Sequence, residues 1–356
     1  MPPERAAAEV AVRPGADGVA DAAADAALAA GVREGDRRAI AKAITLLEST
    51  RTDHRRRADS LLDSLLPATG RALRVGISGV PGVGKSTFIE TLGMFLVGRG
   101  HRVAVLAVDP SSGVSGGSIL GDKTRMERLS ATERAYIRPS PSSGALGGVA
   151  ERTREAMLVC EAAGHDVVIV ETVGVGQSET AVAGMTDIFV LLQLPNAGDD
   201  LQAMKKGIME LADLVVINKA DLDADAALRA EAQVAGALRV LRAGGPPGHG
   251  DEARWQVRVL RASAATGDGL EAFWDAVGEF RRLREASGEF AERRRRQSLA
   301  WLWDEVHARL VADFRAHPEV REALPATLAE VAASRLAPSS GARRLLDLFE
   351  RPAQKT

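Results

Sequence analysis

Residues 75–87 read Val-Gly-Ile-Ser-Gly-Val-Pro-Gly-Val-Gly-Lys-Ser-Thr, and this stretch decides the fold of the chain. The pattern Gly-x-x-x-x-Gly-Lys-Ser runs from Gly79 to Ser86, after an apolar run and before a helical pattern that starts at Thr87. These features are typical of a phosphate-binding P-loop. Its glycines let backbone N–H groups turn toward phosphate oxygens, and the positive N-terminal end of the next helix adds to the attraction.

The same stretch supplies the first candidate site residues. Lys85 can reach the β- and γ-phosphates of a nucleotide, and the Ser86 hydroxyl can ligate Mg²⁺. A glycine-rich turn between a strand and a helix is the alternative, but it does not explain the eight-residue spacing together with Lys-Ser. We therefore expect the phosphates to be bound by Gly79, Pro81, Gly82, Val83, Gly84, Lys85, Ser86 and Thr87.

Composition narrows the class of protein further. The chain has 356 residues, 46% of them apolar, and a formal net charge of −2, which argues against a sequence-independent nucleic-acid binder. The lone cysteine, Cys160, rules out an internal disulfide and disfavours a thiolate metal site. No apolar run reaches the roughly 18 residues of a membrane span, and the N-terminus lacks a signal-peptide core. We expect a cytoplasmic protein that binds neither nucleic acid nor membrane.

Strands and helices alternate in the middle of the chain. Several candidate strands are continuous apolar runs, such as Val167–Val170, which suit strands buried on both faces of a parallel sheet. The candidate strands are 73–78, 102–108, 166–171, 187–194, 213–218 and 256–262. The expected fold is an α/β P-loop NTPase with a mostly parallel, doubly wound sheet, whose ligands bind beyond the carboxyl ends of the strands.

The flanking segments have helical or low-complexity patterns. We expect disorder over residues 1–22, a helical segment over 23–72, the nucleotide-binding domain over 73–285, and a helical region over 286–356. The apolar stripes of the C-terminal region can pack on a partner subunit or on the chain's own core, and the pattern favours neither.

The motif Asn218-Lys219-Ala220-Asp221 follows a strand and identifies the base. A carboxylate at Asp221 can accept hydrogen bonds from guanine N1–H and from its 2-amino group, which adenine does not offer on that edge. Asn218 and Lys219 brace the loop, and the lysine stem can cover the base. The motif therefore predicts GTP and GDP as ligands. Ser263-Ala264, after the last strand, is a weaker signal that agrees, because its backbone can donate to guanine O6.

Acidic residues after other strands are candidate metal and switch groups. Glu171 ends one strand and can hold Mg²⁺ through water, while the N–H of Gly174 can sense the γ-phosphate. Val175 stands where a water-orienting glutamine is found in Ras-like proteins, which predicts slow intrinsic hydrolysis. Asp109 and Asp122 lie in a Ser/Gly-rich loop and can reach the metal or its waters. A turn residue remains the alternative for Asp122.

Several blocks together resemble one family, the MeaB/ArgK/MMAA GTPases, which are G-protein chaperones of adenosylcobalamin-dependent acyl-CoA mutases. The resemblance runs from about Gly35 to the C-terminus. Besides the P-loop it rests on Ala-Val-Asp-Pro-Ser-Ser at 107–112, Gly-Gly-Ser-Ile-Leu-Gly-Asp-Lys-Thr-Arg-Met at 116–126, Arg-Pro-Ser at 138–140, Gly-Gly at 147–148, Glu-Thr-Val-Gly-Val-Gly-Gln-Ser-Glu at 171–179 and Asn-Lys-Ala-Asp at 218–221.

The resemblance implies roles that the spacing does not show. Asp109, Asp122 and Glu171 would be metal- and switch-linked acids, and Gln202 and Lys205 would couple GTP hydrolysis to the mutase. The C-terminal helices would form a homodimer, and the partner mutase would have its cobalamin loaded, protected or exchanged under control of GTP.

Three other classes share this kind of sheet. A nickel-delivery metallochaperone usually carries His or Cys metal sites, whereas the six histidines here are scattered and Cys160 is alone. A small-molecule kinase would use ATP and would not need the guanine motif. A partition- or targeting-type ATPase has an extra lysine early in the P-loop, where this chain has Val80.

Overall fold

The computed structural model describes residues 16–49, 51–108, 126–139, 146–172, 178–195, 206–243 and 255–350. Within these ranges seven strands form one sheet, in which every pair of neighbours is parallel. The strands are β1 (Leu73–Gly79), β2 (Val103–Val108), β3 (Ala135–Arg138), β4 (Val167–Thr172), β5 (Ile188–Gln193), β6 (Leu214–Ile217) and β7 (Arg258–Arg261). Their order is β3-β2-β4-β1-β5-β6-β7, which confirms the predicted α/β class.

The order of the strands places the P-loop at the centre of the sheet. After β1 the chain builds outward on one side through β2 and β3, returns to insert β4, and then continues on the other side with β5 to β7. The carboxyl end of β1 therefore lies at the point where the strand order reverses, which is where open α/β sheets bind ligands.

Strand β3 is the element that the sequence analysis missed. It has four residues, and its register pairs Val103 with Ala135 and Leu106 with Arg138. Arg138 ends the strand on an incompletely buried edge position. The apolar run here, Ala135 to Ile137, is only three residues long and lies between Arg134 and Arg138, so pairing with β2 reveals the strand.

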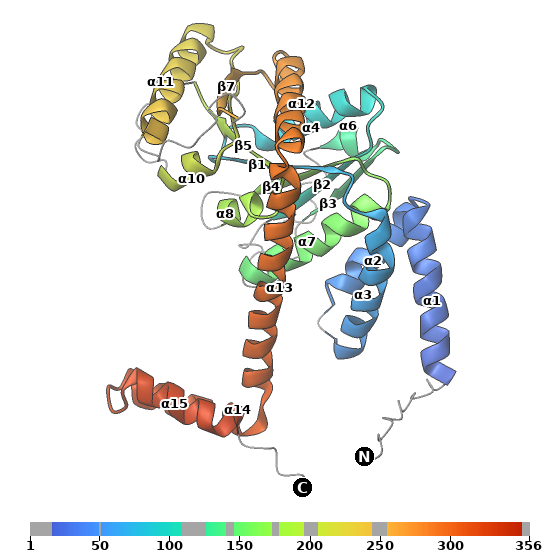
Figure 1. Ribbon diagram of the computed structural model, residues 1–356, viewed down its shortest axis with the longest axis vertical. Helices are drawn as coiled ribbons and strands as arrows, with labels where there is room; N and C mark the ends of the chain where they lie inside the picture. The colour runs from blue at the N-terminus through green and yellow to red at the C-terminus, as the bar shows by residue number, and fades with distance from the viewer. Residues whose placement is uncertain are drawn as a thin grey trace, which may run out of the picture. The chain divides into compact units, whose positions relative to one another are not determined.

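Helices cover both faces of the sheet (Figure 1). On one face, α4 (Lys85–Gly98), α6 (Glu127–Ser130) and α12 (Leu270–Ala286) bury side chains such as Phe88 and Phe273, whose rings meet edge to face at 5.4 Å. The other face carries α7 (Leu146–Ala162), α8 (Ser178–Ala183), α10 (Lys206–Leu211) and α11 (Ala224–Ala243). Strands with both faces covered explain the continuous apolar runs of the sequence.

The N-terminal helices α1 (Ala16–Arg33), α2 (Arg37–Leu47) and α3 (Thr52–Leu65) pack on one another and on α7, and the short 3₁₀ helix η1 (Leu66–Ala68) leads into β1. Asp36 caps α2 by accepting a hydrogen bond from the N–H of Ala39 at 2.6 Å, as an N-cap residue does. Helix α1 begins inside the stretch 1–22, and residues 1–15 lie outside the described ranges.

The chain divides into two compact units, Met1–Arg293 and Arg294–Thr356. The division falls within α13 (Glu289–Ala316), which follows α12 after Gly288, a residue with φ of +76°. In the second unit α14 (Pro318–Ala332) packs on α15 (Pro338–Phe349), and the ring of Phe349 meets that of Phe314 at 5.4 Å.

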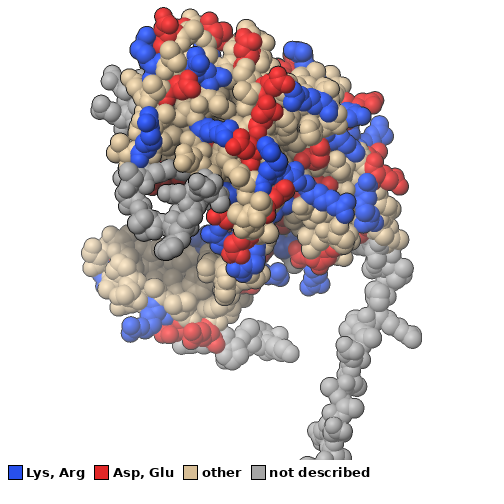
Figure 2. Space-filling model, turned by 45° about the horizontal axis from the view of Figure 1, so that its top comes forward, with Lys and Arg blue, Asp and Glu red and all other residues tan. Residues whose placement is uncertain are grey.

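The charged side chains are mixed in sign. On the face drawn in Figure 2, Lys and Arg alternate with Asp and Glu, and no broad patch of one sign covers it. No helix in the described ranges is both long and apolar enough to cross a membrane.

Candidate nucleotide-binding site

The P-loop connects β1 directly to α4. Gly79 ends β1, and a Cβ added there would lie 2.6 Å from the carbonyl oxygen of Leu192 on the neighbouring strand β5, so no larger residue fits. Gly84 has φ of +91°, and its missing Cβ would lie 3.0 Å from the Asn218 side-chain amide. The two glycines at the ends of the motif are therefore required by backbone shape and by close neighbours.

Lys85 is folded over this loop. Its Nζ donates to the carbonyl oxygen of Gly79 at 2.7 Å and to that of Val80 at 3.4 Å. Burial lowers the pKa of Lys85, and the negative charges of Glu171 and Glu179 partly offset that effect. A bound phosphate would be attracted by the ammonium group of this half-buried lysine, and a bound cation would be attracted by the two carboxylates.

Asn218 ties the guanine motif to the P-loop. Its side chain is fully buried, Nδ2 donates to the carbonyl oxygen of Val83 at 2.8 Å, and Oδ1 accepts from the N–H of Ala264 at 3.1 Å. We call these two hydrogen bonds the Asn218 bridge. They join three segments that are 135 and 46 residues apart in sequence, namely the P-loop, the end of β6 and the loop after β7.

Lys219 adds a second link to the P-loop. Its Nζ donates to the carbonyl oxygen of Gly82 at 2.9 Å. Its backbone has φ of +59°, one of two positive values at non-glycine residues in the described ranges. Such a conformation costs about 1–3 kcal/mol and persists only where surrounding contacts impose it. The contacts of Asn218 and Lys219 impose it here, which leaves Asp221 exposed at the end of the motif.

Asp221 and Ser263 line a common cavity of about 410 Å³ beyond the carboxyl end of β7. The Ser263 hydroxyl accepts from the N–H of Thr266 at 3.2 Å, so it stabilises its own turn. The N–H of Ala264, predicted to face guanine O6, donates to Asn218 Oδ1 instead. A guanine O6 bound beside Ala264 would therefore share the Ala264 N–H with Asn218 Oδ1.

Glu171 lies at the carboxyl end of β4, where register pairs it with Ile77 of β1, and its side chain is 3% exposed. The next residue, Thr172, donates from Oγ1 to Ser78 Oγ at 2.9 Å, and both side chains are buried. This contact joins the carboxyl end of β4 to the carboxyl end of β1, just before the P-loop. The structure thus places Glu171 beside Lys85, as the charge effect on Lys85 also indicates.

Glu179 is the site residue that sequence reasoning did not single out. It lies in the first turn of α8, is 1% exposed, and acts electrostatically on Lys85. It stands at the end of the block 171–179, and a buried glutamate is not visible in a pattern where Glu normally marks a solvated helix start. Asp109, Asp122, Gly174, Gln202 and Lys205 lie outside the described residues.

A P-loop at the reversal of a parallel sheet, braced by an Asn-Lys-x-Asp motif, defines a GTP-binding P-loop protein. Its arrangement can hold a nucleoside triphosphate, select guanine and present the γ-phosphate to Glu171 and Lys85. Comparison with known proteins then identifies the family. The family model described as methylmalonyl Co-A mutase-associated GTPase MeaB matches residues 40–319. The chain belongs to this family of GTPases.

Individual relatives agree. A putative GTPase of Caulobacter vibrioides is 55% identical over 87% of this chain and 93% of its own length. GTPase ArgK of Escherichia coli is 47% identical over 87% of this chain and 92% of its own. The mouse protein named methylmalonic aciduria type A homolog, mitochondrial, is 47% identical over 87% and 76%. A solved LAO/AO transport system kinase is 39% identical, with a TM-score of 0.70, over 92% of this chain and 98% of that one.

Proposed function

We propose that this GTPase binds an adenosylcobalamin-dependent acyl-CoA mutase and uses GTP hydrolysis to gate loading, protection or reactivation of the mutase's cofactor. The observation that carries the proposal is the match of a mutase-associated GTPase family over residues 40–319, which spans both the P-loop and the guanine motif. The mouse relative is named methylmalonic aciduria type A homolog, and this name also points to methylmalonyl-CoA metabolism.

In this proposal GTP and Mg²⁺ are the ligands of the site. Lys85 would hold the β- and γ-phosphates, Ser86 would ligate Mg²⁺, and Asp221 would read guanine. Glu171, with Asp109 and Asp122, would hold waters of the metal. No group of three or more His, Cys, Asp and Glu side chains that suits a metal is found in the described ranges. The phosphates would supply part of the coordination, as is usual for Mg²⁺.

The C-terminal helices are proposed as the homodimer surface. Apolar side chains that are about half exposed or more occur along this region. A second subunit that covers them would remove their apolar surface from water, which favours association. These side chains are Leu299, Leu302, Trp303, Leu310, Val311, Leu328 and Leu346. A cytoplasmic location and the roles of Gln202 and Lys205 in coupling hydrolysis to the mutase complete the proposal.

The test is co-purification with candidate mutases, followed by GTPase rates with and without each one. Methylmalonyl-CoA, isobutyryl-CoA and 2-hydroxyisobutyryl-CoA mutases are the candidates. We expect one of them to bind in a nucleotide-dependent manner and to raise the slow intrinsic rate. A Lys85→Ala variant controls for contaminating GTPases, because it lacks the phosphate-binding ammonium. If no candidate binds and none changes the rate, the mutase role is refuted while the GTPase assignment stands.

A nickel-delivery metallochaperone is the second candidate, and it predicts a different ligand. Its sites usually combine His and Cys, whereas Cys160 is fully buried and burial raises the pKa of its thiol far above the ordinary value. Stoichiometric nickel or zinc binding by the purified protein, measured by equilibrium dialysis, would favour this alternative over the mutase role.

A further inference from the structure

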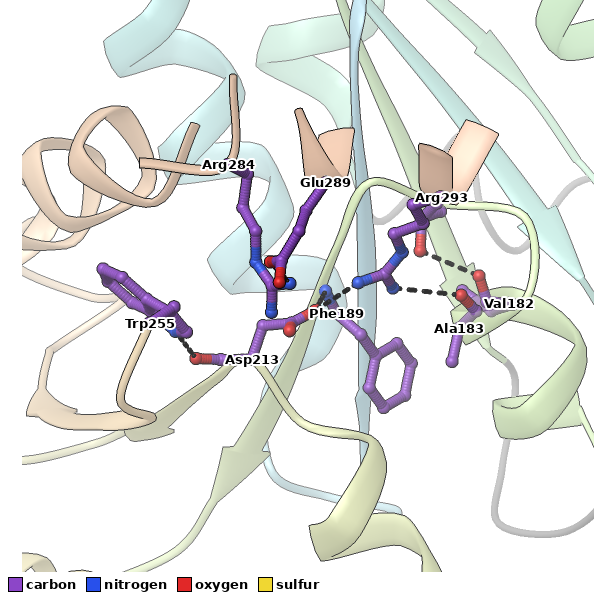
Figure 3. Close-up of polar contacts among 9 residues, drawn as sticks. Val182, Ala183, Phe189, Asp213, Trp255, Arg284, Glu289 and Arg293 are labelled. Carbon is purple, nitrogen blue, oxygen red and sulfur yellow. Dashed lines mark hydrogen bonds and ion pairs between the residues drawn. The ribbon is translucent and has the colours of Figure 1, made fainter. Parts of the chain in front are cut away.

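Arg293 joins two elements of the nucleotide-binding unit that are far apart in sequence (Figure 3). Its Nη1 lies 3.2 Å from Oδ2 of Asp213, and its Nη2 donates to the carbonyl oxygen of Ala183 at 3.3 Å. Arg293 itself comes from the first turns of α13. One guanidinium therefore holds two acceptors at once, which its planar fork suits and which a lysine cannot reproduce.

The Asp213 side of this contact is rigid. Asp213 lies just before β6, and its side chain is 11% exposed. The same Oδ2 accepts from the N–H of Phe189 at 2.9 Å, and the backbone N–H of Asp213 donates to the Phe189 carbonyl at 2.8 Å. Its own carbonyl accepts from Trp255 Nε1 at 2.8 Å. Asp213 is thus fixed to β5 and to the segment before β7, as Figure 3 shows.

Ala183 belongs to α8, the helix that also carries Glu179, whose charge acts on Lys85 of the P-loop. Ala183 is the last residue of α8, so its carbonyl is one of those that a helix leaves without an internal partner. A cation at that end also interacts favourably with the helix dipole. The other end of α8 carries buried Glu179 and comes six residues after Thr172, the neighbour of Glu171. Six helical residues span only about 9 Å.

Helix α8 also packs directly against the strand that bears the P-loop. A Cβ added at Gly76 of β1 would lie 2.9 Å from Val182 and 2.7 Å from Thr186. Because α8 packs on β1 in this way, any shift of α8 would change the position of Glu179 relative to β1 and to Lys85. Whatever fixes the carboxyl end of α8 therefore also fixes Glu179 in its first turn.

We propose that Arg293 is a positioning residue for GTP hydrolysis, which holds α8 against the fixed Asp213 and so sets the place of Glu179 relative to the P-loop. This inference rests on the GTPase function and is independent of the mutase. It also assigns α13 a role, because the helix that supplies Arg293 continues into the second unit.

Intrinsic single-turnover hydrolysis of GTP, without any mutase, tests the assignment. Arg293→Ala should lower the rate constant about tenfold, the usual effect of losing one hydrogen bond to a charged group, and change GDP affinity less than twofold. Arg293→Lys keeps the charge but reaches one acceptor, so it should fall between wild type and alanine. Asp213→Asn should lower the rate in the same direction, and the Arg293→Ala/Asp213→Asn double variant should not add the two losses.

Arg51→Ala is the matched control, since Arg51 forms an exposed pair with Asp53 two residues away at 2.7 Å. It should hydrolyse GTP at the wild-type rate. Amide hydrogen exchange across 178–184 should be faster in Arg293→Ala than in wild type, with exchange in α11 unchanged. A wild-type rate in folded Arg293→Ala overturns the proposal, and so does a parallel fall of rate and GDP affinity, which would mean a purely structural role. If alanine does not fold, Arg293→Lys decides by the same criteria.

Discussion

Replacing Asn218 with alanine should lower the free energy of unfolding by about 2–4 kcal/mol. The Asn218 bridge satisfies the carbonyl of Val83 and the N–H of Ala264, and these residues are 0% and 5% exposed. Each polar group left unpaired in the interior costs about 1–3 kcal/mol, so the two together cost about 2–6 kcal/mol. Water that enters the space of the lost amide recovers part of this, which selects the lower half of the range.

The same substitution should weaken the binding of GTP and of GDP by the same factor, about 10- to 30-fold. Val83 belongs to the P-loop, and Ala264 belongs to the loop after β7 that contacts the base. Without the bridge, only a fraction of the molecules have the two loops correctly placed relative to each other. Affinity falls by the fraction of molecules that keep the competent arrangement. A bridge worth 1.4 kcal/mol in that equilibrium corresponds to a tenfold loss. Both nucleotides use both loops, so the loss does not discriminate between them.

Urea denaturation followed by circular dichroism measures the first quantity, and competition titration against a fluorescent GDP analogue measures the second. Lys219→Met is the matched comparison, because it removes a single half-exposed hydrogen bond to Gly82, at 2.9 Å, from the same motif. It should cost no more than about 1 kcal/mol. Unfolding energy within about 0.5 kcal/mol of wild type for Asn218→Ala, or a loss confined to GTP, would refute the reasoning.

Three further predictions concern single ionisable groups. Asp221→Asn should cut GTP affinity about 10- to 100-fold, through loss of a charged acceptor, yet leave stability within about 0.5 kcal/mol because the side chain is exposed; guanine preference that survives would contradict the assignment. Burial lowers the pKa of Lys85, so GDP affinity in wild type should begin to fall below the ordinary lysine value of 10.5, whereas Lys85→Arg should give a flat profile over that range. Burial also lowers the pKa of His165 from 6.5 to about 4, so the unfolded chain binds a proton first and stability should fall by about 3 kcal/mol as pH drops through that window. Urea midpoints of wild type and His165→Gln across the same window check this, and equal slopes would count against it.

The sheet could be predicted from sequence to the extent that its strands are long and apolar. β1, β2, β4 and β5 have six or seven buried residues each and were predicted within a residue or two of their ends. β6 and β7 have only four residues each, but they lie within the longer candidate runs 213–218 and 256–262 and were predicted. β3 has a three-residue apolar run between two arginines, so its existence depends on pairing with β2.

In the candidate site, too, some residues could be predicted from the sequence and others could not. Gly79, Lys85 and Asp221 follow from spacing alone, because the chemistry of a phosphate loop and of a guanine contact fixes the residue types. The engagement of the Ala264 N–H depends on Asn218, which is 46 residues away in the chain, and the burial of Glu179 is likewise a property of the folded chain. No local pattern reports them.

The Asn218 bridge limits where a switch between GTP and GDP can arise. It fixes the base loop to the P-loop by contacts with Val83 and Ala264, and neither contact involves the γ-phosphate position. A ligand that binds two states equally shifts neither, so the base and its loop contribute affinity without discrimination. Among the described residues, Glu171 and Glu179, which act on the charge of Lys85, are the groups suited to such discrimination. Glu179 lies in the first turn of α8, and the last residue of this helix is held by Arg293. We therefore expect substitutions along α8 to alter GTP hydrolysis before they alter GDP affinity.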